Sequence, residues 1–78
     1  MSLIDLSESE EGVVEYVAGG RGLTMRLISL GIVPGVKVKV VRRGPVGGPI
    51  ILKVNTSEVA IGRGMAARIY VTPVRREG

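Results

Sequence analysis

Residues 33–40 read Val-Pro-Gly-Val-Lys-Val-Lys-Val, a turn that leads directly into a strand. Proline at position 34 presets the φ angle of the first central residue of a type II turn, and glycine at position 35 supplies the positive φ angle of the second. The strict alternation of valine and lysine over residues 36–40 then predicts a half-buried strand whose valines face a core. Together, the turn and the strand favour a small, turn-rich β fold.

A short helix is predicted just before this turn, over residues 23–30. Leu23, Leu27 and Leu30 recur at helical spacing and form one narrow stripe. Gly31 follows at the place where a residue in the left-handed conformation commonly ends a helix. About eight residues are too few for a helix that is stable alone in water, so the leucine stripe must pack over a sheet.

Short strands separated by turn residues are predicted in the rest of the chain, because short apolar stretches are bounded there by Gly, Pro, Asn or Ser. The expected strands are residues 12–17, 36–40, 50–54, 58–61 and 69–72, with a long connection over 42–49 and a turn or single helical turn over 62–68. In the first strand, Val14 and Tyr16 are expected to share one face. Five short strands and one surface helix predict a mainly β fold, a small antiparallel barrel of SH3-like size.

The composition narrows the chemistry that the chain can perform. Val, Ile and Leu supply 26 of the 78 residues and Gly supplies 12, which suits short strands joined by tight turns. The chain has no cysteine and no histidine, so it lacks a thiol nucleophile, an imidazole base and the soft or imidazole ligands of transition metals. Ser29 and Ser57 have no evident base in the sequence. We therefore expect no enzymatic activity, no cofactor and no specific metal site.

A single domain is predicted over residues 4–74. Residues 1–3 and 77–78 resemble ends added during cloning, and we assign no function to them. No apolar run approaches the ~18–20 residues that span a bilayer, and the acidic amino terminus does not resemble a signal peptide. These features predict a cytoplasmic protein that does not insert into a membrane.

Charge is divided unevenly along the chain. Residues 1–20 carry a charge of −5, whereas residues 21–78 carry +9. A basic stretch of this kind is one signature of a nucleic-acid surface. Lys and Arg on the solvent face of strands also account for it, and no aromatic residues are interleaved with the charges for base stacking. We favour the second explanation and keep nucleic-acid binding as an alternative.

Two further motifs contain only some of the residues that a ligand-binding site of their type requires. Residues 19–22 read Gly-Gly-Arg-Gly between a strand and a helix, where phosphate-binding loops occur. They lack the third glycine of a dinucleotide fingerprint and any following Lys-Ser or Lys-Thr pair, so we expect a hinge. Glu8, Glu10 and Glu11 lack the glycine turn and the ligand spacing of a calcium loop, so we expect a solvated acidic segment.

Candidate binding residues lie on the side of the helix away from the leucine stripe. At 100° per residue, Met25 and Ile28 fall opposite that stripe and should be at least partly exposed. Adjacent exposed apolar side chains can mark an interaction site, although scattered surface apolar residues need no special explanation. The candidate contact residues are Arg21, Met25, Arg26 and Ile28 around the helix, with Arg42 and Arg43 as a second, weaker basic candidate.

Two motifs occur in a fixed order, Arg-Leu-x-x-Leu-Gly-x-x-Pro-Gly over residues 26–35 and Pro-Val-Gly-Gly-Pro-Ile over residues 45–50. Together they resemble the FeoA family, and the resemblance covers nearly the whole chain, about residues 4–74. Gly20-Arg21-Gly22-Leu23 before them and Glu58-Val59-Ala60-Ile61 after them continue the match in the same order. Each half is weak alone, whereas the two at this distance are fairly specific together.

The resemblance implies an SH3-like barrel that serves bacterial ferrous iron uptake. Proteins of the FeoA family are small cytoplasmic companions of the membrane transporter FeoB, which carries a cytosolic G-protein domain, and the resemblance implies action through protein contact. The same domain type occurs at the carboxyl end of iron-dependent repressors of the DtxR type. We therefore expect a regulatory or accessory protein that contacts FeoB. The alternatives are a barrel that binds RNA or DNA, a repressor-type domain and a self-assembling barrel.

Overall fold

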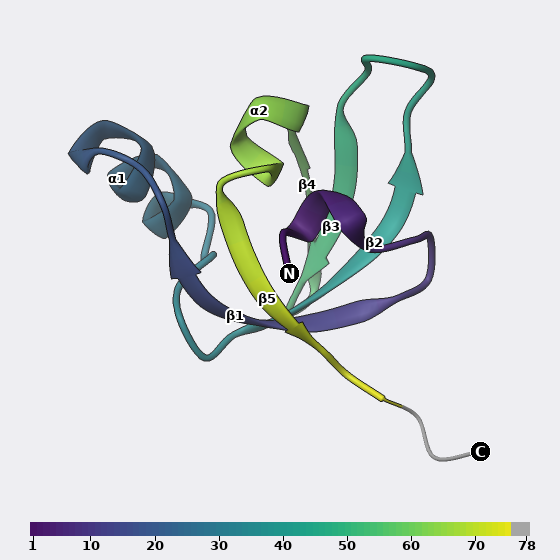
Figure 1. The fold of residues 1–78 in the computed structure, drawn as a ribbon, viewed down its shortest axis with the longest axis horizontal. Coiled ribbons are helices and arrows are strands. Elements are labelled where there is room, and N and C mark those ends of the chain that lie inside the picture. The colour runs from purple at the N-terminus through teal and green to yellow at the C-terminus, as the bar shows by residue number, and fades with distance from the viewer. Residues whose placement is uncertain (76–78) are drawn as a thin grey trace.

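Most of the molecule is one antiparallel β-sheet that curls on itself (Figure 1). The computed structural model describes residues 1–75. Its strands are β1 (Glu11–Val17), β2 (Lys37–Arg43), β3 (Ile50–Val54), β4 (Ser57–Ile61) and β5 (Ile69–Pro73). Its helical elements are the 3₁₀ helix η1 (Leu3–Asp5), α1 (Arg21–Ser29) and the short α2 (Arg63–Ala66). The strand order is β4-β3-β2-β1-β5, and the prediction of a mainly β fold with five antiparallel strands is confirmed.

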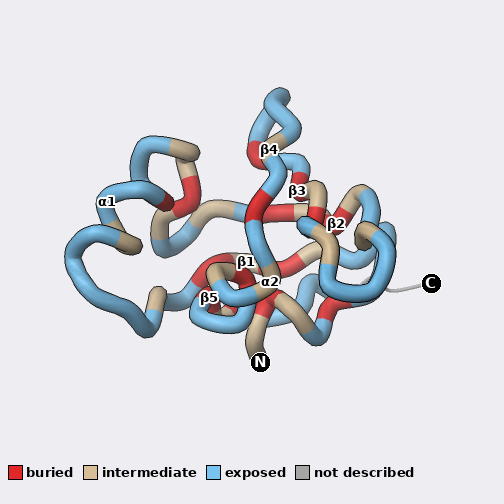
Figure 2. Tube along the Cα trace, turned by 90° about the horizontal axis from the view of Figure 1, so that it is seen from above, coloured by how far each residue is buried: buried red, intermediate tan, exposed pale blue. Residues whose placement is uncertain are grey.

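Alternation along the strands builds the core as the sequence predicts. Val38 and Val40 of β2 are buried while Lys37 between the turn and Val38 is exposed. Buried positions lie along the inner side of the curled sheet (Figure 2). Apart from Gly12 they are all aliphatic: Leu3, Leu6, Val14, Leu27, Ile32, Val38, Val40, Ile50, Leu52, Val54, Ile61, Ala66, Ile69 and Val71. Among residues 1–75 no polar or charged residue is buried, so burial of branched aliphatic surface is the main stabilising contribution.

Two irregularities in strand pairing bend the sheet. The β1–β5 register shifts between Val14 and Tyr16, and the β2–β3 register shifts between Val40 and Arg42. Such bulges bend a strand and increase its local twist, which helps a single sheet to close on its own apolar face.

The bulge in β1 also overturns our expectation that Val14 and Tyr16 share one face. Val14 pairs with Val71, whereas Tyr16 pairs with Tyr70, and consecutive residues of β5 point to opposite faces of the sheet. Val14 is therefore buried, while the Tyr16 side chain is 52% exposed and stacks on Tyr70 with ring centroids 4.8 Å apart. Uninterrupted alternation cannot predict this switch, because the extra residue of a bulge reverses the faces that follow it.

The connections between the elements have the geometry that their turn residues predict, except that one connection is shorter than expected. Gly35 has a φ angle of +93°, and the Val36 N–H donates to the Val33 carbonyl at 3.1 Å, as a type II turn requires. The connection expected over 42–49 is shorter, because Arg42 and Arg43 still pair with β3 as the last residues of β2. The residues over 62–68 form the single helical turn α2.

The first residues of the chain belong to the barrel, although we expected the domain to begin at residue 4. Leu3 and Leu6 are fully buried in the core. Ser2 forms a β-bridge with Tyr70, and the Val71 N–H donates to the Met1 carbonyl at 2.7 Å. Residues 1–3 therefore add to the sheet beside β5. Residues 77–78, the other expected added end, lie outside the described residues.

Arg43 fastens this amino-terminal segment to β2. Its Nη1 donates to the carbonyls of Ile4 at 2.9 Å and Leu6 at 2.7 Å, and its backbone N–H donates to the Glu8 carboxylate at 3.1 Å. The guanidinium thus satisfies two carbonyls beside the core with charge-assisted hydrogen bonds, which are stronger than neutral ones.

Replacing Arg43 with Met should lower the free energy of unfolding by about 1.5–3 kcal/mol, because two partly buried carbonyls lose a charged donor. Arg42→Met is the matched control: it removes the same charge from the neighbouring, exposed position and should change stability by less than about 0.5 kcal/mol. Urea denaturation of the two variants measures the difference. Equal stability of both variants would contradict the role assigned to Arg43.

Candidate functional site

Helix α1 lies at one end of the barrel, where it connects β1 to β2 (Figure 1). Its N-cap is Gly20, in an extended conformation and without a side-chain cap. The residues over 19–22 join β1 to α1, and Arg21 and Gly22 are already part of the helix. The helix begins at Arg21, two residues earlier than expected, and ends at Ser29.

The carboxyl end of α1 is closed by a Schellman motif. Gly31, with a φ angle of +82°, donates its N–H to the Ile28 carbonyl, and the Ile32 N–H donates to the Leu27 carbonyl, both at 2.9 Å. These two hydrogen bonds satisfy carbonyls that a helix end would otherwise leave unpaired. The predicted role of Gly31 is confirmed, and the motif sets the direction in which the chain leaves the helix toward β2.

The leucine stripe of α1 holds the helix on the barrel. Leu27 is completely buried, and Leu23 and Leu30 are partly buried against the core. Ile32, the residue after the Schellman glycine, is buried in the same cluster. A nine-residue helix would not persist alone in water, so these contacts are what keep α1 folded.

The opposite side of α1 presents an apolar pair to solvent. Met25 is 59% exposed and Ile28 is 48% exposed, and residues three apart on a helix are neighbours. Arg21 is also exposed, and at 100° per residue it falls between them in angle, so Arg21, Met25 and Ile28 form one stripe, here called the α1 outer face. Arg26 is exposed too, but it lies about 100° around the helix from Met25 and only about 40° from Leu30, so it borders the leucine stripe and not this face.

The second basic candidate does not join the α1 outer face. Arg42 and Arg43 end β2 at the hairpin that precedes β3, whereas α1 connects to the start of β2 (Figure 1). Arg42 is exposed, while the Arg43 guanidinium is occupied by the carbonyls of Ile4 and Leu6. The structure therefore separates the two sets of predicted residues and gives Arg43 a structural role.

The acidic segment makes local contacts. The Glu10 carboxylate accepts the Ser7 N–H at 2.6 Å, and the Glu8 carboxylate accepts the Arg43 N–H. Within residues 1–75, no three side chains of His, Cys, Asp or Glu lie together in a way that could hold a metal ion. In the same part of the chain, no helix is long and apolar enough to cross a membrane.

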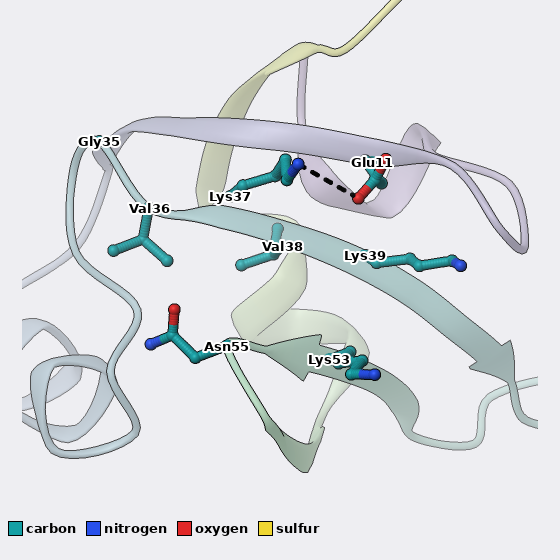
Figure 3. A pocket seen from close by; sticks show the side chains of 8 residues that line it. All are labelled: Glu11, Gly35, Val36, Lys37, Val38, Lys39, Lys53 and Asn55. Carbon is teal, nitrogen blue, oxygen red and sulfur yellow. Dashed lines mark ion pairs between the residues drawn. The ribbon is translucent and has the colours of Figure 1, made fainter. Parts of the chain in front are cut away.

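A second surface, which the sequence did not reveal, lies on the outer side of β1, β2 and β3. It is a hollow of about 510 Å³, here called the lysine hollow (Figure 3). Its lining residues are Glu11, Gly35, Val36, Lys37, Val38, Lys39, Lys53 and Asn55. Alternation alone predicts that the lysines face solvent. It does not predict that Lys39 and Lys53 are direct partners across two strands, because this depends on the hairpin register.

Fold and surface together define a small barrel module with one exposed helix face. The FeoA domain family matches residues 1–73, and the chain belongs to this family. A relative from Methanocaldococcus jannaschii that carries the name Fe(2+) transport protein A is 44% identical over 64 residues, which cover 82% of this chain and 76% of that protein. The family assignment inferred from the sequence motifs is thus confirmed.

Solved structures agree on the fold. FeoA of Stenotrophomonas maltophilia, described as a prokaryotic SH3 domain protein and crystallised with zinc, is similar with a TM-score of 0.78 and 33% identity, covering 91% of this chain and 88% of that one. A manganese-dependent transcriptional repressor is similar with a TM-score of 0.86 and 20% identity, covering 95% of this chain and 41% of the repressor chain. At that identity the second match shows the fold alone. The SH3-like barrel is therefore shared with repressor domains.

Truncating a side chain to alanine should affect stability differently on the two sides of α1. Leu27→Ala should lower the free energy of unfolding by about 2–5 kcal/mol, because it opens a cavity in the core. Met25→Ala, on the same helix but exposed, should change it by less than about 0.5 kcal/mol. Thermal or urea unfolding of both variants measures the contrast, and a large loss in Met25→Ala would show that Met25 is part of the core.

Proposed function

We propose that this protein is a regulatory or accessory component of ferrous iron uptake that acts by binding the FeoB transporter through the α1 outer face. The observation that carries the proposal is the exposed Met25–Ile28 pair on a helix whose other side is anchored in the core. Membership of the FeoA family and the iron-transport name of its relative support the iron-uptake setting.

The energetics of α1 suit a docking surface. Full burial of a Met or Ile side chain contributes about 1.5–3 kcal/mol, so this pair supplies a substantial fraction of a moderate binding energy. Leu27 and the Schellman motif already hold the helix in place, so little conformational entropy remains to be lost on binding. Arg21, next to the pair, adds a planar cation of the type enriched at protein interfaces.

Action by contact, without catalysis or a resident metal, fits the residues present. The chain has neither histidine nor cysteine, and the carboxylates of Glu8 and Glu10 accept backbone N–H groups in the amino-terminal segment. Ferrous iron is in this view the cargo of the transporter that the protein contacts.

The proposal predicts that Ile28→Glu and Met25→Glu each weaken binding to the cytosolic part of FeoB by at least tenfold. A carboxylate at either position would have to lose its hydration on docking, which is costly. Val46→Glu is the matched control, because it places the same charge at a fully exposed valine on the hairpin between β2 and β3, away from α1. Biolayer interferometry with the immobilised cytosolic part of FeoB measures the three affinities.

The unfolding midpoints of the three variants separate a lost contact from a lost fold. We expect all three to remain within a few degrees of the unchanged protein, because the substituted side chains are exposed. Full binding by Ile28→Glu and Met25→Glu would refute the α1 outer face as the contact. Loss of binding in Val46→Glu alone would assign the contact to the hairpin instead.

A further inference from the structure

The lysine hollow contains two positive charges that face each other across the sheet. Lys39 of β2 and Lys53 of β3 are direct partners in the antiparallel register. The Cβ atoms of such partners are about 4.5–5.5 Å apart, and like charges in this arrangement destabilise a sheet. In Figure 3 both side chains extend toward the same end of the hollow, so their ammonium groups can reach one bound group.

Two acids, Glu11 and Glu58, are register neighbours of this pair. The Glu11 carboxylate forms a salt bridge with Lys37 at 3.7 Å, although Glu11 is itself the register partner of Lys39. Glu58 is the register partner of Lys53, but it does not line the hollow. Within residues 1–75, neither Lys39 nor Lys53 has a carboxylate within salt-bridge distance.

The arrangement of charges selects the chemistry of the ligand. An extended acidic peptide or a nucleic-acid strand needs a row of free cations along a strand, and Lys37, which would extend such a row on β2, is paired with Glu11. No aromatic side chain for base stacking lines the hollow. Two ammonium groups side by side match one compact group of charge close to −2 with several acceptor oxygens, which describes a phosphate, whereas a carboxylate carries only −1.

We infer that the lysine hollow binds a phosphate dianion, free or as a small phosphate monoester, between Lys39 and Lys53. Asn55 lines the opposite end of the hollow and directs its side-chain amide toward Val36 (Figure 3). The amide thus lies away from the two ammonium groups, and the proposed site rests on the two lysines alone. The hollow shares no residue with the α1 outer face, so this inference does not depend on FeoB.

An NMR titration of the full chain labelled with ¹⁵N tests the inference, with inorganic phosphate and glycerol 3-phosphate as the probes at ionic strength held constant with NaCl. Both probes should give saturable shifts of the backbone amides of Lys39 and Lys53. Lys39→Ser and Lys53→Ser should each weaken binding at least tenfold, whereas Lys53→Arg should retain it. Arg68→Ser, which removes the same charge from an exposed position outside the hollow, should change affinity by less than twofold.

The two probes also separate the sources of the phosphate. Equal affinity shows that the hollow recognises the phosphate group alone, and tighter binding of the monoester shows that its walls contact the ester as well. The inference is overturned by shifts that do not saturate, or by equal weakening in Arg68→Ser, which would reflect net charge. Shifts centred on residues 20–22 at the start of α1 would also overturn it, as would lysine-dependent binding of a single-stranded RNA without binding of either phosphate.

Discussion

The sheet removes its apolar face from water by curling around it, with helical segments completing the core, and the rest of this structure depends on that curvature. Bulges in β1 and β2 bend the sheet, and Leu3 and Leu6 fill the core from the amino-terminal segment. Arg43 then ties this segment to β2 through the carbonyls of Ile4 and Leu6. The core is purely aliphatic, so packing and hydrogen bonds of the backbone supply most of the stability.

Because the inside of the barrel is filled with aliphatic side chains, recognition is left to the outside. The structure offers two separate surfaces there. The α1 outer face combines the apolar pair Met25 and Ile28 with Arg21. It is rigid because Leu27 and the turn at Gly31 hold the helix against the barrel. The lysine hollow is polar and lies over β1, β2 and β3. We propose the first surface for a protein partner and the second for a compact anion, and the two share no residue.

The fold was largely predictable because its signals are local. Leucines spaced along residues 23–30, glycines at 31 and 35 and the alternating valines of β2 each act within a few residues of sequence. The exposed Met25–Ile28 pair followed from helix geometry in the same way. The hydrogen bonds of Arg43 could not be predicted, because its partners Ile4 and Leu6 are almost forty residues away along the chain.

The sequence by itself determined the five strands, the helix over most of its length, the apolar sides of α1 and β2, and membership of the FeoA family, since periodicity, turn residues and motif order are written within short stretches. Tertiary structure alone decided which strands are neighbours and in what register. That register exposes Tyr16 beside Tyr70, brings Leu3 into the core and sets Lys39 opposite Lys53. Such pairings join residues that are distant along the chain, and their geometry is set by closure of the whole sheet, which no short stretch of sequence encodes.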